Sequence, residues 1–227
     1  MNGSILIIAA SIAIALLWWG ITSFLKYLEQ KRKEMILTAE QIGLQLDDEK
    51  PSKKAIDTKP KYANELSKKN ARLRYLFVGS IGEDGLTIRI FQHGYTISTG
   101  QSAYTIYHRA GYVRCPEDWP TTRICTRRKG KMKFGTWKKK NEITLENDEF
   151  NRRFMVKSFD PDFAVTLLNP DLQEALLSVD KKIAGAWHIE SGRLWYLEKG
   201  SMTPLSLPLT MKHFRLFVDY IYPELWR

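Results

Sequence analysis

Residues 72–92, RLRYLFVGSIGEDGLTIRIFQ, are two β-rich runs separated by a short acidic stretch that contains glycine. Aromatic and β-branched residues favour extended strands, and Glu83-Asp84-Gly85 has the composition of a tight turn. We therefore expect a β-hairpin at this point of the chain. A hairpin of this kind favours an antiparallel sheet in the domain around it.

The segments that follow extend this pattern towards the C-terminus. Residues 102–113 (SAYTIYHRAGYV) and 152–159 (RRFMVKSF) read as strands, and 184–189 with 192–198 indicate a hairpin that turns near 190–192. Two helices are expected to open at Asp160-Pro161 and Asn169-Pro170, because Asp and Asn cap free backbone N–H groups and proline needs no donor there. A last amphipathic helix is indicated by apolar residues at helical spacing: Met211, Phe214, Phe217, Val218 and Ile221.

These elements predict an α+β fold in which a mainly antiparallel sheet is packed by C-terminal helices. We assign them to one domain over residues 71–227, which is long enough for a single hydrophobic core. Before it, residues 47–70 are charged, contain two prolines and have few large apolar side chains, so we predict a linker.

The N-terminal part is dominated by Ile5–Leu25, a run of 21 uncharged and mostly apolar residues. As a helix it would be roughly 31 Å long, about the thickness of the hydrocarbon core of a bilayer. A signal peptide would need a basic start and a small-residue cleavage site, and a core helix would need a polar face. The run has none of these features, so we predict a transmembrane anchor over residues 1–26.

The charges that flank this anchor predict its direction. Basic residues gather on its C-terminal side, whereas Met1 to Ser4 carry no charged side chain. Basic flanks stay in the cytoplasm, which places the N-terminus outside and the domain inside. The basic flank consists of Lys26, Lys31, Arg32 and Lys33.

Residues 27–46 are expected to continue as a juxtamembrane helix. Apolar residues recur at spacings of three and four along this segment, with Arg32 as an interruption: Leu25, Leu28, Met35, Ala39, Ile42 and Leu46. Such a seam indicates either a short coiled coil that joins two copies or another protein, or an amphipathic helix that lies on its own domain.

Motifs for catalysis or metal binding are missing from the sequence. No phosphate-binding glycine loop, G-x-S-x-G or H-E-x-x-H motif occurs, and His93, His108, His188 and His213 are scattered without ligand spacing. The carboxylates of Asp160 and Asp162 are explained by helix capping. We therefore predict no catalytic residue, no metal site and no cofactor.

One segment departs from the average composition of the chain. Residues 121–141, TTRICTRRKGKMKFGTWKKKN, contain nine basic residues and no acidic one, in a chain with a formal net charge of +10. Such a segment binds anionic lipid headgroups, binds nucleic acid, or forms a solvated loop. The candidate anion-binding or lipid-binding residues are Arg123, Arg127, Arg128, Lys129, Lys131, Lys133, Phe134, Trp137, Lys138, Lys139 and Lys140.

Residues 150–177, FNRRFMVKSFDPDFAVTLLNPDLQEALL, resemble an uncharacterised family of bacterial membrane-anchored proteins with a domain of unknown function. The residues that fit are Phe150, Phe154, Asp160, Pro161, Ala164, Leu168, Asn169 and Pro170. The resemblance implies a bacterial protein, a membrane anchor and a compact α+β domain, and for such a protein we predict the inner membrane as the location. It implies no activity, and the basic segment is not a feature of that family.

Our leading hypothesis is a single-pass membrane protein whose cytoplasmic domain is an interaction or scaffold module. Its basic segment would contact anionic lipid headgroups or an acidic protein partner, because the anchor holds the segment near a bilayer. One alternative is a membrane-tethered enzyme whose active site is assembled from distant residues, for instance near His93, His108 or Asp160. Another is a nucleic-acid-binding component of a bacterial defence or transport assembly.

Overall fold

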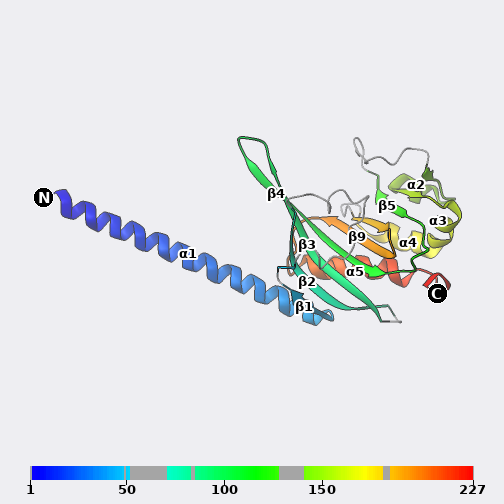
Figure 1. Ribbon diagram of the computed structural model, residues 1–227, viewed down its shortest axis with the longest axis horizontal. Helices are drawn as coiled ribbons and strands as arrows, with labels where there is room; N and C mark the ends of the chain where they lie inside the picture. The colour runs from blue at the N-terminus through cyan, green and yellow to red at the C-terminus, as the bar shows by residue number, and fades with distance from the viewer. Residues whose placement is uncertain are drawn as a thin grey trace.

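The computed structural model describes residues 2–48, 50–51, 71–82, 85–127, 141–180 and 185–226, with side chains from Ser11 onward (Figure 1). The helices are α1 (Asn2–Gln41), α2 (Asp148–Arg153), α3 (Pro161–Leu167), α4 (Pro170–Ser178), α5 (Ser206–Asp219) and the short 3₁₀ helix η3 (Pro223–Trp226). The strands are β1 (Leu44–Asp48), β2 (Arg72–Ile81), β3 (Leu86–Ser98), β4 (Ala103–Arg114), β5 (Thr122–Thr126), β6 (Glu142–Ile143), β7 (Phe154–Ser158), β8 (Gly185–Ile189) and β9 (Arg193–Lys199).

The strands form one antiparallel sheet in the order β1-β2-β3-β4-β9-β8-β5-β7-β6. The predicted α+β class, with an antiparallel sheet packed by C-terminal helices, is confirmed. Helix α5 covers one face, which we call the helix face: the rings of Trp187 on β8 and Phe217 on α5 stack 5.6 Å apart. The opposite face carries a second buried cluster that contains Phe91, Tyr112 and Trp195.

Both predicted hairpins are present. Strands β2 and β3 pair from Ile81 opposite Leu86, and Glu83 and Asp84 of the expected turn lie outside the described residues. Strands β8 and β9 turn at Ser191 and Gly192, whose φ angles are +54° and +64°. Positive φ at both central residues is the geometry of a type I′ turn, which suits the twist of the flanking strands.

The two predicted helix starts are also confirmed. The side chain of Asp160 accepts a hydrogen bond from the backbone N–H of Phe163 (3.0 Å), and that of Asn169 accepts one from Leu172 (2.9 Å). Proline occupies the first helical position of both α3 and α4. Local chemistry alone decides these boundaries, because the capping atoms lie within three residues of the groups that they satisfy.

Helix α1 ends earlier than the sequence suggests. The expected juxtamembrane helix over residues 27–46 stops at Gln41, and Leu46 belongs to β1 instead. Gly43, with φ +78°, adopts the left-handed conformation that commonly follows a helix end. The chain then reverses, and Leu44 pairs opposite Gly79 at the edge of the sheet. Pairing at the edge of the sheet therefore decides the conformation of Leu44–Asp48, against the helical spacing of its apolar residues. A five-residue edge strand has little signal in the sequence by which it could be predicted.

Two further local differences concern the strands. The run RRFMVKSF was expected to be a strand throughout, but Arg152 and Arg153 end helix α2 and the strand begins at Phe154. The start of the basic segment was not expected to be a strand, yet Thr122–Thr126 is β5, which lies between β8 and β7. Its five residues gain their strand conformation from these two neighbours rather than from local propensity.

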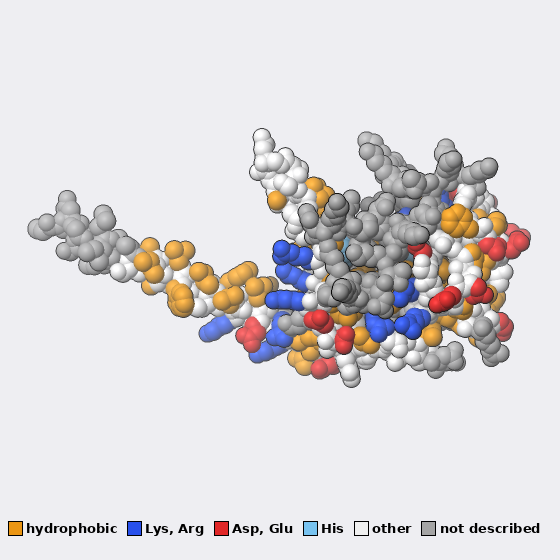
Figure 2. Space-filling model, in the orientation of Figure 1, with side chains coloured by type: hydrophobic (Ala, Val, Ile, Leu, Met, Phe, Trp, Pro, Cys, Tyr) orange, Lys and Arg blue, Asp and Glu red, His pale blue; other side chains and the backbone are white. Residues whose placement is uncertain are grey.

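Helix α1 has two different halves (Figure 2). Its N-terminal half exposes large apolar side chains, such as Leu16, Leu17 and Trp18, which are each at least 63% exposed. By length and composition, α1 is able to cross a membrane. Its C-terminal half packs on the domain, where Met35 and Ala39 are buried in the main core. The seam from Met35 onward thus lies on its own domain, as the second interpretation predicts, whereas Leu25 and Leu28 are exposed.

Candidate functional site

Of the eleven residues predicted to bind anions, Arg123 and Arg127 lie in the described part of the chain. The other nine lie outside the described residues, and their predicted role stays a prediction: Arg128, Lys129, Lys131, Lys133, Phe134, Trp137, Lys138, Lys139 and Lys140. The site must therefore be built outward from the two arginines that strand β5 positions.

Arg127 has a structural role at the end of β5. Its Nε donates hydrogen bonds to the carbonyl oxygens of Asn151 (2.6 Å) and Phe154 (3.0 Å), and its Nη2 donates to the Glu142 carboxylate (2.5 Å). These bonds tie the strand to α2 and β6. Because Nε and Nη2 are engaged in this way, the bonds of Arg127 explain its position structurally, and its predicted role in binding anions stays a prediction.

Arg123 lies in a row of basic residues that the sheet assembles on the face opposite α5. It sits directly across from Lys157 on β7 and from His188 on β8. Directly opposed residues in antiparallel strands have Cβ atoms about 5 Å apart. We call Lys157, Arg123 and His188 the basic row. Lys157 and His188 are buried and Arg123 is half-buried.

Aromatic residues continue the same line across the sheet. His188 lies opposite Trp195, Trp195 opposite Tyr112, and Tyr112 opposite Arg89. The Arg89 and Arg193 guanidinium groups lie 5.9 and 5.5 Å from the centre of the Tyr112 ring, within cation–π range. The line therefore has basic residues at both ends and the aromatic side chains of Trp195 and Tyr112 between them.

The electrostatics of the basic row favour a bound anion. Lys157 and Arg123 are directly opposed on neighbouring strands, so two basic residues lie close together at this point of the sheet. Burial, and secondarily the charge of Arg123, holds the pKa of His188 well below its usual range, so its ring is neutral at neutral pH. A neutral imidazole beside two cations can donate one hydrogen bond to a phosphate or carboxylate oxygen.

His188 predicts a specific pH dependence of stability. Among the described residues neither of its ring nitrogens has a hydrogen-bond partner, and the side chain is 1% exposed. Its pKa is lower in the folded than in the unfolded chain, so the unfolded chain binds the proton first as the pH falls. Folding stability should thus decrease below about pH 6.5, by at most about 1.4 kcal/mol per pH unit from this group.

Replacing His188 by leucine should remove this contribution. Chemical denaturation of the full chain in mild detergent between pH 7 and pH 5 would measure it, with His213 unchanged in both proteins. Equal slopes in the wild type and the variant would show that His188 takes up its proton normally in the folded state.

Sequence reasoning missed most of this line, because Lys157, His188, Arg89 and Arg193 are far from one another along the chain. The available signal was Lys157 itself. It is a charged residue inside an otherwise apolar strand, in which all five residues are buried. Charged residues are rarely buried within a strand, so such a position draws attention to the face of the sheet on which it lies.

A second polar cluster lies on the helix face. Arg109 on β4 forms an ion pair with Glu198 on β9 (2.6 Å), and the other carboxylate oxygen accepts a hydrogen bond from the Tyr196 hydroxyl (3.2 Å). That hydroxyl also lies 3.1 Å from Nδ1 of His213 on α5. This cluster joins the sheet to α5, and burial lowers the pKa of His213.

The three residues suggested for an active site assembled from distant parts of the chain do not all lie in one place. His93 and His108 do meet across β3 and β4, with ring centres 6.3 Å apart, whereas Asp160 caps α3. Within the described part of the chain, no three His, Cys, Asp or Glu side chains gather as metal ligands would. The alternative of an enzyme whose active site is assembled from residues distant in sequence stays a prediction.

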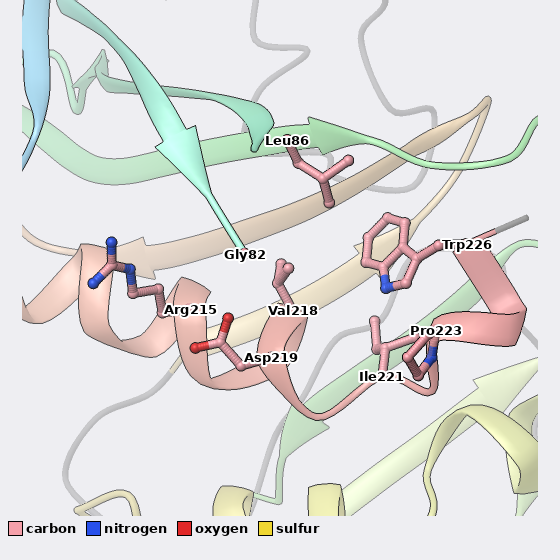
Figure 3. Close-up of a pocket in the computed structure, with 8 residues that line it drawn as sticks. All are labelled: Gly82, Leu86, Arg215, Val218, Asp219, Ile221, Pro223 and Trp226. Carbon is pink, nitrogen blue, oxygen red and sulfur yellow. The ribbon is translucent and has the colours of Figure 1, made fainter. Parts of the chain in front are cut away.

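A cavity of about 490 Å³ lies between the end of α5 and the turn that joins β2 to β3 (Figure 3). Its apolar wall includes Leu86, Val218 and Trp226, and the charged side chains of Arg215 and Asp219 lie at its α5 side. A second cavity of about 510 Å³ between α1 and α5 shares these two charged residues. Neither cavity contains a residue of the basic row.

Comparison with known proteins gives a partial match to a family model and no activity. Residues 106–191 match the family described as a protein of unknown function (DUF3137). This match includes residues 150–177 and confirms the resemblance to a family of unknown function. The crystal structure of the mycobacterial trehalose monomycolate transport factor A, TtfA, matches with a TM-score of 0.49 and 11% identity, over 84% of this chain and 97% of that one. No curated protein matches the sequence.

Proposed function

We propose that this chain is a single-pass membrane protein whose domain is an interaction module for anionic partners. The observation that carries the proposal is helix α1. Its apolar half is exposed along its described length, and its other half is buried against the domain that it would hold. Exposing that much apolar surface to water is unfavourable by about 25 cal/mol per Å², and a bilayer removes this cost.

The charges around α1 support a direction for the anchor. Lys26, Lys31 and Arg32 follow the apolar half and precede the domain. Basic residues next to a membrane helix are retained in the cytoplasm. The domain would thus face the cytoplasm from the bacterial inner membrane. Because α1 is one unbroken helix, the roughly 22 Å between Lys26 and Gln41 acts as a stiff spacer rather than a flexible tether.

The basic row supports the choice of an anionic partner. Arg123 and Lys157 lie opposite each other in the sheet, and Arg123 is half-buried. A guanidinium group suits a phosphate or carboxylate because its planar donors match the oxygens of these groups. The group would come from a lipid headgroup or from an acidic segment of a partner protein. Both sources present the same oxygen chemistry to the row.

Replacing Arg123 by glutamine tests this role in the full chain, reconstituted in nanodiscs of phosphatidylcholine. Loss of one charge-assisted hydrogen bond should weaken binding of an acidic peptide, or of added vesicles containing phosphatidylglycerol, by about tenfold or more. The arm that responds identifies the source of the anion. Fluorescence anisotropy and vesicle co-sedimentation are suitable measurements.

The matched control is Arg152→Gln, which makes the same change of charge at an exposed position on α2. It should leave both affinities nearly unchanged. If the two variants weakened binding equally, the interaction would depend on net charge alone and the basic row would have no specific role.

A further inference from the structure

Strands β3 and β4 extend beyond the rest of the sheet as a two-stranded ribbon, residues 95–107 (Figure 1). Pairing of β2 with β3 ends at Gly94, and pairing of β9 with β4 ends at His108. Beyond these points the two strands pair with each other, and one further backbone hydrogen bond, from the Gly200 N–H to the Tyr107 carbonyl oxygen (2.8 Å), fixes the base of the ribbon. We call residues 95–107 the β3–β4 ribbon.

The composition of the ribbon is unusual for this chain. Its thirteen residues, YTISTGQSAYTIY, contain no charged side chain, although 26% of the whole chain is charged. Figure 2 shows it as a projection without acidic or basic side chains. Water-exposed strand edges are normally protected by charges, prolines or covering elements. The β3–β4 ribbon lacks charges and proline on either strand, so its two edges have neither of these protections.

The ribbon has two different sides. Tyr95 lies opposite Ile106, and Ile97 lies opposite Tyr104, so these four apolar side chains share one side. The other side carries hydroxyl groups, with Thr96 and Thr105 hydrogen-bonded to each other (3.1 Å). Tyr104 is 52% exposed, and the tip from Ser98 to Ala103 is exposed throughout. This two-sided character suits a boundary between water and lipid.

The topology points the ribbon towards the apolar half of α1. After α1 the chain reverses at Gly43, so β1 runs back along the last turns of the helix. Strand β3 is parallel to β1, because each is antiparallel to β2. The C-terminal end of β3, where the ribbon begins, therefore lies at the end of the sheet nearest the predicted anchor, as Figure 1 shows.

The lengths of the two elements are compatible with a shared membrane surface. Leu44 and Ile88 lie at the same level, because both are opposite Gly79. From Ile88 the strand reaches roughly 36 Å to Thr99 at the ribbon tip, at about 3.3 Å per residue. Helix α1 covers roughly 22 Å from Gln41 back to Lys26. The ribbon therefore reaches the level of Lys26 even when it is inclined by about 45° to α1.

Basic side chains surround the base of the ribbon. Arg72 and Arg74 lie opposite Gly94 and Gln92 on one flank, and Lys199 lies opposite His108 on the other; all three are exposed. In Figure 2, Lys and Arg side chains gather along the edge between the ribbon and α1. Positive charge at this edge would complement anionic headgroups, at about fivefold in affinity per residue.

From these observations we propose that the β3–β4 ribbon rests in the headgroup layer of the bilayer that α1 crosses. It forms a second contact that holds the domain against the membrane. The ribbon stops in the headgroup layer, because its unpaired edge N–H and C=O groups would have no partner in the hydrocarbon core. This inference rests on the proposed anchoring by α1.

A fluorescent label at the ribbon tip tests the proposal in the full chain. Gln101→Cys, labelled with NBD and reconstituted in nanodiscs with phosphatidylglycerol, should be quenched by spin-labelled headgroups and protected from aqueous iodide. The matched label at Glu174→Cys, an exposed site on α4, should show the opposite pattern. Native thiols do not compete, because Cys115 and Cys125 are buried and burial raises the pKa of both, to about 12 for Cys115.

Two charge insertions on neighbouring residues separate the sides of the ribbon. Tyr104→Asp on the apolar side should abolish the headgroup quenching, whereas Thr105→Asp on the hydroxyl side should retain most of it. Arg74→Gln should lower the ratio of membrane-bound to water-exposed ribbon, as reported by the Gln101 label, roughly fivefold. A Gln101 label as accessible to iodide as the Glu174 label would overturn the proposal, as would a contact that required an added protein. Co-elution of the chain with the nanodiscs reports the α1 anchor separately.

Discussion

Replacing Glu198 by alanine should destabilise the domain by about 3–5 kcal/mol. Glu198 and Arg109 form an ion pair whose side chains are 9% and 12% exposed. Removing the carboxylate leaves the Arg109 guanidinium buried with one remaining described hydrogen bond, to the carbonyl of Ser201 (3.1 Å). The Tyr196 hydroxyl also loses one of its two hydrogen-bond partners and keeps Nδ1 of His213. Chemical denaturation of the full chain in mild detergent would measure the change.

The control is the double variant Arg109→Met with Glu198→Leu, which removes both charges together. It should be much closer to the wild type in stability, because replacing a buried pair by apolar residues of similar size is often neutral or stabilising. If Glu198→Ala cost less than about 1 kcal/mol, the pair would behave as a surface salt bridge and the cluster would not hold α5 to the sheet.

The connection between α1 and the domain gives the second large effect. Ala39 lies on the side of α1 that packs into the main core, and its side chain is completely buried. Ala39→Glu therefore places a carboxylate where it has neither space nor water. We expect a loss of about 3 kcal/mol or more in folding stability, from overpacking and the burial of charge. Hydrogen exchange of β1 and α5 amides should become faster, because both elements contact this part of α1.

Leu37→Glu is the matched control, since it introduces the same side chain two residues away at a position that is 58% exposed. It should change stability by no more than about 0.5 kcal/mol. Equal exchange rates in the two variants would mean that α1 does not pack firmly on the domain. The stiff spacer in the proposed function would then be wrong.

The features that the sequence predicted correctly are the ones whose causes are local. The caps at Asp160 and Asn169, and the turn at Ser191-Gly192, depend on atoms a few residues apart. The amphipathic pattern of α5 was equally clear, because one face of a helix repeats every three to four residues. The apolar run of α1 needed only its length and composition.

Other features depend on register between distant strands. The basic row joins Arg123 to Lys157 and His188, which are 34 and 65 residues further along the chain, and no local pattern reports that pairing. Strands β1 and β5 are short and were missed for the same reason. The apolar spacing along α1 was recognised from the sequence. Tertiary packing decides that Met35 and Ala39 contact the domain of the same chain and not a second helix. The β3–β4 ribbon is recognisable only once it is known where β2 stops pairing with β3 and where β9 stops pairing with β4.

The central claim is that the apolar half of α1 lies in a bilayer and holds the domain there. Alkaline carbonate extraction of membranes from bacterial cells that express the full chain tests it most directly. The chain should stay in the membrane pellet. A variant with Leu16→Arg and Leu17→Arg should shift to the soluble fraction, because each arginine near the centre of the run costs about 3 kcal/mol on insertion. Release of the unmodified chain together with peripheral proteins would contradict the claim.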